Sequence, residues 1–352
     1  MATMPHALTS LVETTNRVAV FSCVCCGHES AIGAPVVRAA GEARPFELHR
    51  CMECGVVQQF PRWTAPRITA LYDQDYYVFA EREEHRWARA IQQYVIHLAA
   101  FESQAAFLDV RRATTASNQG TGPRFLDVGC ARGHLAALAR RRGWRVTGLD
   151  LSADAVSEAA VRFGLDVRAG SLSSHVGTLM PFDVILLGDV IEHVPDPVRF
   201  LQDIRKVLAP EGILCIDTPN WGGFWRRWGG AGWLGLNRYH INLFDAESLP
   251  GLLGRCGFRD VSVDAYTHYR YQGWITRPEV RRWISWMPGF VGWRIGRFLE
   301  RRGGGKTWSN LITNPPVDLE GALGRLGEMV KAGPIASQPT AKGDNLIARA
   351  RR

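Results

Sequence analysis

The sequence lacks several features that would place it in a membrane or in an oxidising compartment. No apolar run approaches the roughly 18 residues that a membrane-spanning helix needs. Residues 1–21 show neither the basic start nor the apolar stretch of a secretory signal. We therefore expect a cytoplasmic protein, in which disulfides are disfavoured and clustered cysteines indicate metal binding.

A basic surplus is absent from the first 270 residues, which hold 28 Lys or Arg and 28 Asp or Glu. Residues 271–352 hold 14 Lys or Arg against 6 Asp or Glu, so the whole net charge of +8 belongs to them. Nine of the twelve tryptophans also fall at or after Trp221. The C-terminal quarter is therefore expected to have a task of its own.

Five of the eight cysteines precede residue 55. Two CxxC pairs, each followed by glycine, are separated by 24 residues. Two such turns supply four thiolates to one tetrahedral ion and leave no open position for catalysis. We predict a structural Zn²⁺ in a zinc-ribbon-like module, held by Cys23, Cys26, Cys51 and Cys54. Replacement of one ligand by Cys25 or His28, or a set of unligated core thiols, are the alternatives.

Strands and helices alternate after residue 121, which predicts an α/β fold with a parallel sheet and ligands at the carboxyl ends of its strands. A helix from Glu81 to Leu108 is expected before this region. The expected strands are 125–129, 145–150, 182–189, 212–219, 261–269 and 345–351, and the expected helices are 134–142, 197–208 and 245–256.

The strongest chemical signal is the turn between Phe125 and Gly133, in the order Asp-x-Gly-x-Ala-x-Gly. Its glycines let the backbone approach a ligand, and the next helix offers unpaired amides. Asp150 ends the following strand, where a carboxylate can accept hydrogen bonds from both ribose hydroxyls. The order differs from the GxGxxG of nicotinamide sites. With Asp127 before the first glycine, it suits a nucleoside cofactor that ends in an amino acid.

Six segments carry a resemblance to a known family. FLDVGCARGHLA, VTGLDLS, FDVILLGDVIEHVPDP, LAPEGILCIDTPNW, RYHINLFDAESLPGLLGRCGF and GDNLIARAR resemble the class I S-adenosylmethionine-dependent methyltransferases. They resemble in particular the branch with an N-terminal CxxCG…CxxCG module, which is associated with glycan and natural-product modification. The likeness covers most of residues 23–270 and the last ten. It implies a Rossmann-like sheet, mostly parallel with an antiparallel last strand, and S-adenosylmethionine as cofactor.

The expected organisation has four parts. Residues 1–62 form the zinc-ribbon-like module and residues 63–120 a helical linker or cap. Residues 121–270, together with 343–352, form the Rossmann-like methyltransferase domain. Residues 271–342 form a basic, Trp-rich helical insertion.

The resemblance assigns roles to the cofactor residues. Gly129, Cys130 and Gly133 would cradle the methionine end, and Asp127 would lie near its ammonium group. Asp150 would bind the ribose, and the cofactor floor would be lined by Gly188 and Asp189. The chain departs from the family at Ala131, where the middle glycine is usual. Gly170-Ser171-Leu172 replaces the acid that many relatives offer to adenine, so adenine recognition falls to backbone, Ser171 and apolar packing.

Methyl transfer requires alignment of acceptor and methyl group, and often removal of a proton from the acceptor. His193, after the strand 182–189, and His240, before a helix, are the candidate general bases. A resemblance to the ubiquinone-pathway O-methyltransferases implies instead a divalent cation held by Asp189, Glu192 and His193. A third interpretation is that Glu192 and His193 only orient the turn before Pro197.

The leading hypothesis is O-methylation of a sugar, a glycan or a small-molecule hydroxyl. An RNA methyltransferase is the first alternative, although the zinc module has few basic residues and no NPPY-like signature of base methylation follows the strand 182–189. A non-catalytic cofactor-binding protein is the second. The presence of all four expected cofactor residues argues against a non-catalytic protein: Asp127, Gly129, Gly133 and Asp150.

Two segments are candidates for contacts beyond the cofactor. Residues 221–239, rich in Gly, Trp and Arg, suit an acceptor-facing lid because aromatic faces stack on rings. Residues 281–302 interleave Trp with Arg, which suits a helix pair lying on anionic lipid at the inner membrane face. A packed helical cap and a surface for single-stranded nucleic acid are the other interpretations.

Overall fold

The structure is a computed structural model that describes residues 20–39, 46–62, 66, 82–102, 122–229, 233, 235–266, 316–332, 340 and 342–352. The basic segment 281–302, with its expected membrane or cap role, lies outside the described residues. Within the described part, none of the helices combines the length and the apolar character needed to cross a membrane.

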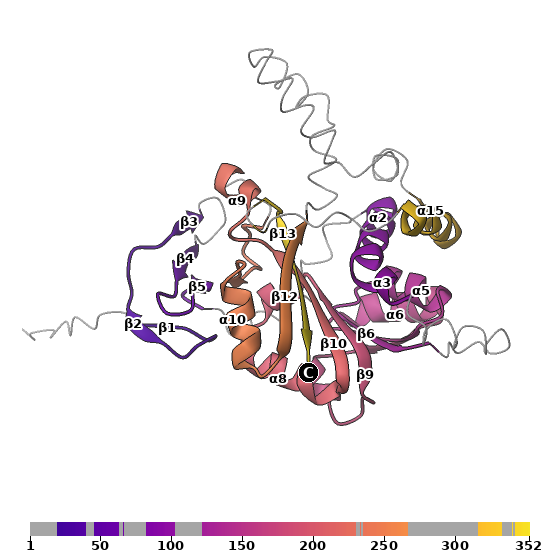
Figure 1. The fold of residues 1–352 in the computed structure, drawn as a ribbon, viewed down its shortest axis with the longest axis horizontal. Helices are drawn as coiled ribbons and strands as arrows, with labels where there is room; N and C mark the ends of the chain where they lie inside the picture. Colours follow the sequence, from indigo (N-terminus) through magenta and orange to yellow (C-terminus); the bar gives the residue numbers. More distant parts are fainter. Residues whose placement is uncertain are drawn as a thin grey trace, which may run out of the picture.

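A seven-stranded sheet forms the centre of the molecule (Figure 1), in the order β12-β13-β10-β9-β6-β7-β8. The strands from β6 to β10 pair in parallel, whereas β13 runs antiparallel to both β10 and β12. This confirms the predicted sheet, including its antiparallel last strand. The bounds are β6 (Arg124–Val128), β7 (Arg145–Asp150), β8 (Asp166–Ala169), β9 (Phe182–Gly188), β10 (Leu208–Pro219), β12 (Arg259–Tyr266) and β13 (Asn345–Arg351).

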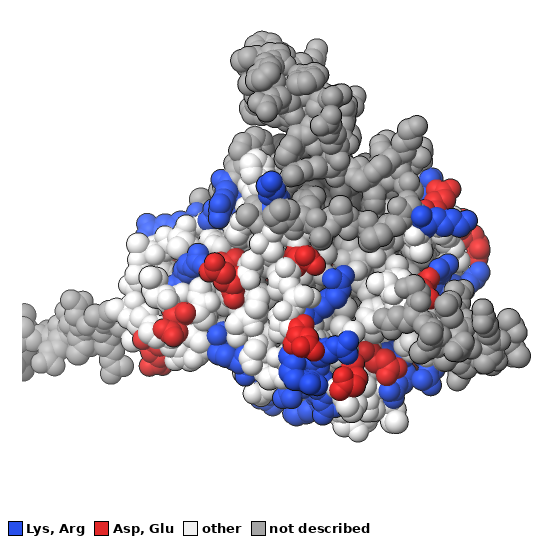
Figure 2. Space-filling model, in the orientation of Figure 1, with Lys and Arg blue, Asp and Glu red and all other residues white. Residues whose placement is uncertain are grey.

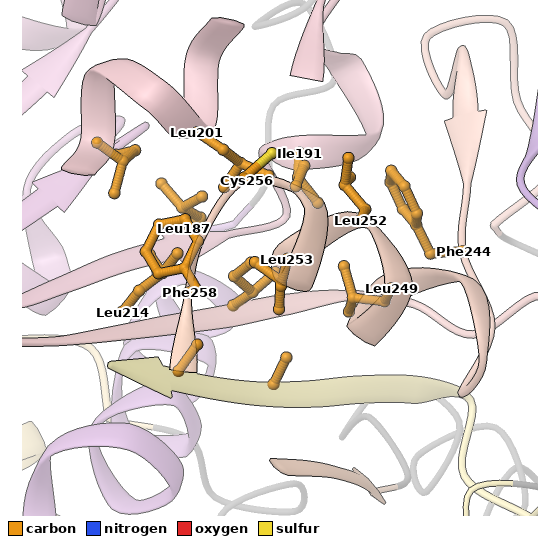
Figure 3. Packing of buried hydrophobic residues seen from close by; sticks show 14 of the residues in the cluster. Leu187, Ile191, Leu201, Leu214, Phe244, Leu249, Leu252, Leu253, Cys256 and Phe258 are labelled. Atoms are coloured by element: carbon orange, nitrogen blue, oxygen red, sulfur yellow. The ribbon is translucent and has the colours of Figure 1, made fainter. Parts of the chain in front are cut away.

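One face of the sheet is covered by α8 (Pro197–Val207) and α10 (Ser248–Arg255). Figure 3 shows strand residues such as Leu187 and Leu214 packed with Leu201 of α8 and Leu253 of α10. Helix α8 begins where expected, because Pro197 fits the first turn and the Asp196 side chain accepts the amide of Arg199 at 3.0 Å. These contacts fix the carboxyl end of β9, where the candidate catalytic residues begin.

The other face is covered by α5 (His134–Arg141), α2 (Glu83–Gln93) and α15 (Leu319–Ala332), whose apolar sides share one core. Helix α2 continues through a π-helical turn, η1 (Tyr94–Leu98), into α3 (Ala99–Glu102). The helix expected over 81–108 is therefore present to Glu102, and its last residues lie outside the described part. The remaining short helices are α6 (Ala153–Phe163), α7 (Leu172–His175), η2 (Ile191–His193) and α9 (Phe224–Gly229).

The N-terminal module consists of a two-stranded and a four-stranded sheet. Strands β1 (Val20–Ser22) and β2 (Glu29–Ala31) pair with each other. Strands β3 (Val37–Ala39), β4 (Phe46–Arg50) and β5 (Val57–Phe60) are joined by β11 (Asn242–Leu243). The module, drawn in indigo in Figure 1, lies beside the orange helix α10, and its Phe21 and Cys51 belong to the same core as that helix. A strand from far along the chain thus completes the module.

Charges of both signs are intermingled on the face shown in Figure 2. Near the carboxyl terminus, Arg351 lies 3.7 Å from both Glu211 and Asp260. Such exposed pairs are screened by solvent and contribute little to stability. Among the described residues drawn on this face, basic side chains therefore lie next to acidic ones.

Candidate active site

The turn that follows β6 is shaped by a glycine that no other residue can replace without a clash. Gly129 has a φ of +77°, and a Cβ atom there would lie 2.6 Å from Cγ2 of Val190. The amides of Gly129 and Cys130 both donate to the carbonyl of Leu149 in β7. The loop is thereby folded back onto the sheet, and its upper surface carries no side chain at position 129.

Asp150, at the end of β7, fixes the same turn. Its Oδ2 atom accepts the amide of Ala131 at 2.8 Å, and its Oδ1 atom accepts the amide of Ser152 at 2.9 Å. Ala131, at the position of the usual glycine, has a φ of +47°. A left-handed conformation costs about 1–2 kcal/mol for a residue with a Cβ, and the hydrogen bond to a charged acceptor offsets this. The turn is therefore formed even though Ala131 stands where the family usually has glycine.

A buried acid and a guanidinium lie beside this turn. Burial, and secondarily the charge of Asp150, raise the pKa of Asp127 to about 7, while the nearby cation of Arg89 opposes the shift. Arg89, on α2, forms an ion pair with Asp189, which follows β9. Arg89 is not among the site residues expected from the sequence, although a cation among the apolar residues of a helix is a signal that could have identified it.

The remaining expected cofactor residues occupy different settings. A Cβ on Gly188 would meet Nε2 of Gln93 at 2.5 Å, so α2 closes tightly over the end of β9. Cys130 is buried, and its Sγ atom lies 2.8 Å from where a Cβ on Gly148 would be. Cys130 thus offers its backbone, and not its thiol, to the turn surface. Ser171 is exposed just before α7, with its hydroxyl 2.9 Å from that of Ser173.

Both candidate bases meet at one buried carboxyl group. The Oε1 atom of Glu192 lies 3.9 Å from Nε2 of His193 and 3.9 Å from Nε2 of His240. Its other oxygen accepts the hydroxyl of Thr218, on β10, at 2.9 Å. The Nδ1 atom of His193 lies 2.8 Å from the carbonyl of Tyr239, and that of His240 lies 2.8 Å from the carbonyl of Gly235.

These contacts fix the protonation of the two imidazoles. A carbonyl oxygen only accepts, so each Nδ1 carries a hydrogen and each Nε2 presents a lone pair. Burial lowers the pKa of His240 to about 4 and also lowers that of His193, whereas burial raises the pKa of Glu192. The two imidazoles are therefore neutral at neutral pH, and burial favours the protonated form of the Glu192 carboxyl that their Nε2 atoms face.

The expected cation site at Asp189, Glu192 and His193 differs from the cluster that forms. Among the described residues, the ligand atoms that lie within 4.8 Å of one another here belong to Glu192, His193 and His240. Asp189 turns instead toward Arg89, with a φ of +54° at its own backbone. The structure thus groups His240, from the segment before β11, with Glu192 and His193, and the cation site expected at Asp189, Glu192 and His193 stays a prediction.

Two tryptophans of the expected lid, Trp221 and Trp233, are buried. Trp221 and Trp233 meet at 6.3 Å between ring centroids and pack with Leu48 and Val57 of the N-terminal module. Arg226 stacks 4.0 Å above the Trp221 ring. These two rings therefore join the segment 221–239 to the module and do not present an open stacking face.

The N-terminal cysteines gather as predicted. The Sγ atoms of Cys23 and Cys54 are 3.5 Å apart, and those of Cys26 and Cys51 are 3.6 Å apart. A tetrahedral ion with bonds of about 2.3 Å places its sulfurs about 3.8 Å apart, so the four thiols fit Zn²⁺. The thiol of Cys25 lies outside the cluster, 3.8 Å from Nε2 of Gln58.

Comparison with known proteins places this geometry in a family. The model of the family described as "Methyltransferase domain" matches residues 79–263. The ubiquinone biosynthesis O-methyltransferase of Parvibaculum lavamentivorans is 37% identical over 102 residues, 28% of this chain and 40% of that protein. That of Caulobacter sp. strain K31 is 37% identical over 107 residues, 28% of this chain and 42% of that protein. The chain spans about two fifths of the length of the curated relatives it matches.

Solved structures show weaker likeness. A phosphoethanolamine N-methyltransferase 2 of Haemonchus contortus, in complex with S-adenosyl-L-methionine, is 15% identical with a TM-score of 0.42. The alignment covers 90% of this chain and 71% of that one.

Proposed function

The chain belongs to the methyltransferase domain family, and on that premise we propose that it transfers a methyl group from S-adenosylmethionine to a hydroxyl of a small molecule. The observation that carries the acceptor side is the anchoring of His193 and His240, whose Nδ1 atoms both face backbone carbonyls. The named activity of the O-methyltransferase relatives supports oxygen as the acceptor atom.

The turn after β6 suits the amino-acid end of the cofactor. Gly129 adopts the left-handed conformation that the turn requires, Asp127 supplies a carboxyl for the ammonium group, and Arg89 supplies a cation for the carboxylate. The carboxylate of Asp150, whose two oxygens accept the amides of Ala131 and Ser152, stands at the end of β7 and would bind the ribose hydroxyls. When bound, S-adenosylmethionine supplies an electrophilic methyl group on a sulfonium centre.

His240 is the general base in this proposal. Its Nε2 lone pair is unprotonated at neutral pH, because burial lowers the pKa of the ring to about 4. During methyl transfer, this nitrogen would accept the proton of the acceptor hydroxyl. Glu192, 3.9 Å away, then faces a new cation, which lowers the pKa of its carboxyl and favours its ionisation.

A divalent cation at the same three residues is the second candidate for this half of the site. The Oε1 atom of Glu192 is buried without a hydrogen-bond partner among the described residues. Histidines that bind metals typically donate the other ring nitrogen to a carbonyl or carboxylate, as His240 does here. A bound cation would orient and acidify the acceptor hydroxyl directly.

We further propose that Cys23, Cys26, Cys51 and Cys54 hold a structural Zn²⁺. Their spacing and their sulfur–sulfur distances support this assignment. Four thiolates saturate a tetrahedral ion, so the zinc would stabilise the module and take no part in methyl transfer.

An acceptor screen tests the proposed function. The purified protein is incubated with S-adenosylmethionine and with phenols, nucleotide sugars, lipid-linked glycans or RNA, and S-adenosylhomocysteine release is measured. We expect release with at least one hydroxyl-bearing small molecule or glycan, and its loss in the His240→Ala variant. Release with RNA alone would overturn the proposal.

A further inference from the structure

We propose that the N-terminal module positions the acceptor half of the active site, with Gln58 and Asn242 as the positioning residues. The module would hold the segment that carries His240, so its metal loading would govern acceptor turnover but not cofactor binding. This inference rests on the proposed role of His240 and extends it to a part of the chain far from the methyltransferase motifs.

The backbone contacts form a continuous ladder from the module to the catalytic residues. Strand β11 pairs with β5, with Asn242 opposite Gln58. Just before β11, the carbonyl of Ile241 accepts the amide of Gln59 at 3.0 Å. The amide of Ile241 donates in turn to the carbonyl of Glu192 at 2.9 Å. The residue directly after His240 is thus held by the module on one side and by the Glu192 segment on the other.

Two buried amide side chains continue this link. The Nε2 group of Gln58 donates to Oδ1 of Asn242 at 3.0 Å, and the Nδ2 group of Asn242 donates to the carbonyl of Val194 at 2.7 Å. Both side chains are fully buried. Arg62, after β5, donates to the carbonyl of Pro195 at 2.6 Å. The segments that follow His193 and His240 are therefore tied to one strand of the module.

The four-cysteine centre holds that strand. The amide of Cys51 donates to the carbonyl of Val56 at 2.9 Å, and β5 begins at the next residue. In small modules a structural metal supplies much of the folding free energy, because the apolar core is limited. Removal of the metal should therefore loosen β5 first, and through it the segment 241–243.

The cofactor turn is held by different contacts. The amide of Ala131 is bound by Asp150, and both residues belong to the β6–β7 end of the sheet. Strand β11 instead lies in the sheet of the module. A change in the module should thus reach Ile241 and leave Ala131 protected.

Neighbouring residues of β5 provide a matched test. The Gln58 amide bonds to Asn242, whereas the buried side-chain amide of Gln59 has no hydrogen-bond partner among the described residues. Gln58→Met, Gln59→Met and metal-depleted wild-type protein are compared by amide hydrogen exchange, calorimetry with S-adenosylmethionine, and acceptor kinetics. Asn242→Asp serves as a second variant that keeps the shape and removes the donor to Val194.

The expected result is exchange at Ile241 about tenfold faster in Gln58→Met, in Asn242→Asp and after metal removal, with kcat/KM for the acceptor lowered by a similar factor. Exchange at Ala131 and cofactor affinity should stay at the wild-type values, as should every readout in Gln59→Met.

Unchanged exchange at Ile241 in both Gln58→Met and Asn242→Asp would overturn the inference. Equal acceleration at Ile241 and Ala131 would also overturn it, because the module would then support the whole fold. Exchange and calorimetry do not depend on turnover. If Ile241 responds as expected while no acceptor is methylated, the proposed function fails and the link to the module remains.

Discussion

The imidazole rings of His193 and His240 meet edge to face with their centroids 4.7 Å apart, and both Nε2 atoms lie 3.9 Å from the same carboxyl oxygen of Glu192. The two histidines come from different loops, one after β9 and one before β11. Since each ring is held at Nδ1 by a backbone carbonyl, both Nε2 atoms face the Glu192 carboxyl group.

Replacing His240 with Ala should lower kcat by a factor of about 10²–10⁴, the usual contribution of a general base. Cofactor affinity measured by calorimetry should not change. Asp150 and the turn after β6 belong to the seven-stranded sheet, whereas His240 precedes β11 of the four-stranded sheet. His85→Ala, an exposed position on α2, is the control and should keep wild-type turnover. Wild-type turnover in His240→Ala on the true acceptor would exclude this residue as the base.

The pH profile of turnover should have its acidic limb far below that of an ordinary imidazole. A base acts only when unprotonated, and burial lowers the pKa of His240 from 6.5 to about 4. Activity should therefore persist as the pH falls from 7 to 5, a range over which an unperturbed histidine base would be lost. The measurement is kcat/KM for the acceptor against pH at saturating S-adenosylmethionine, so that titration of Asp127 in the cofactor site does not enter, with circular dichroism confirming the fold at each point. An acidic limb centred near pH 6.5 would contradict the proposed environment of His240.

Replacing Asp150 with Ala should weaken S-adenosylmethionine binding at least tenfold. Hydrogen bonds to a charged acceptor contribute about 1.5–3 kcal/mol each, and the variant also frees the amide of Ala131. Asp166→Ala, at the exposed start of β8, provides a matched control that should bind normally. Calorimetry that finds equal affinity in the two variants would remove Asp150 from the cofactor site.

Elemental analysis should find one zinc per chain, lost in Cys26→Ala and kept in Cys215→Ala, a buried cysteine of β10. Protein without zinc, prepared free of chelators, would contradict the four-cysteine site.

The same elemental analysis distinguishes His240 as a general base from a divalent cation bound at Glu192, His193 and His240. A second divalent ion that disappears in His240→Ala would favour the cation over the general base.

Much of the fold follows from local sequence signals. Strand β7 was expected from Arg145 to Asp150 and has these bounds, and α8 starts at the expected Pro197. Buried parallel strands are short apolar runs, and caps and prolines mark helix starts, so both are visible locally. The gathering of Cys23, Cys26, Cys51 and Cys54 was likewise expected, because spacing within CxxC turns constrains the thiols.

The parts that could not be predicted depend on contacts between distant segments. Strand β11 has two residues, too few for any periodic pattern. That His240, and not Asp189, joins Glu192 depends on the pairing of β11 with β5 and on Arg89 of α2. The burial of Trp221 against the module has the same origin. In each case the partner lies many residues away, and the local sequence carries no sign of it.

The most direct test of the account is to identify the methylated atom. Protein is incubated with methyl-¹³C-labelled S-adenosylmethionine and the acceptor found by screening, and the product is examined by NMR. We predict a ¹³C methyl signal in the range of a methyl ether, one label per S-adenosylhomocysteine formed. A label on nitrogen or carbon, or release of S-adenosylhomocysteine without a methylated product, would contradict it.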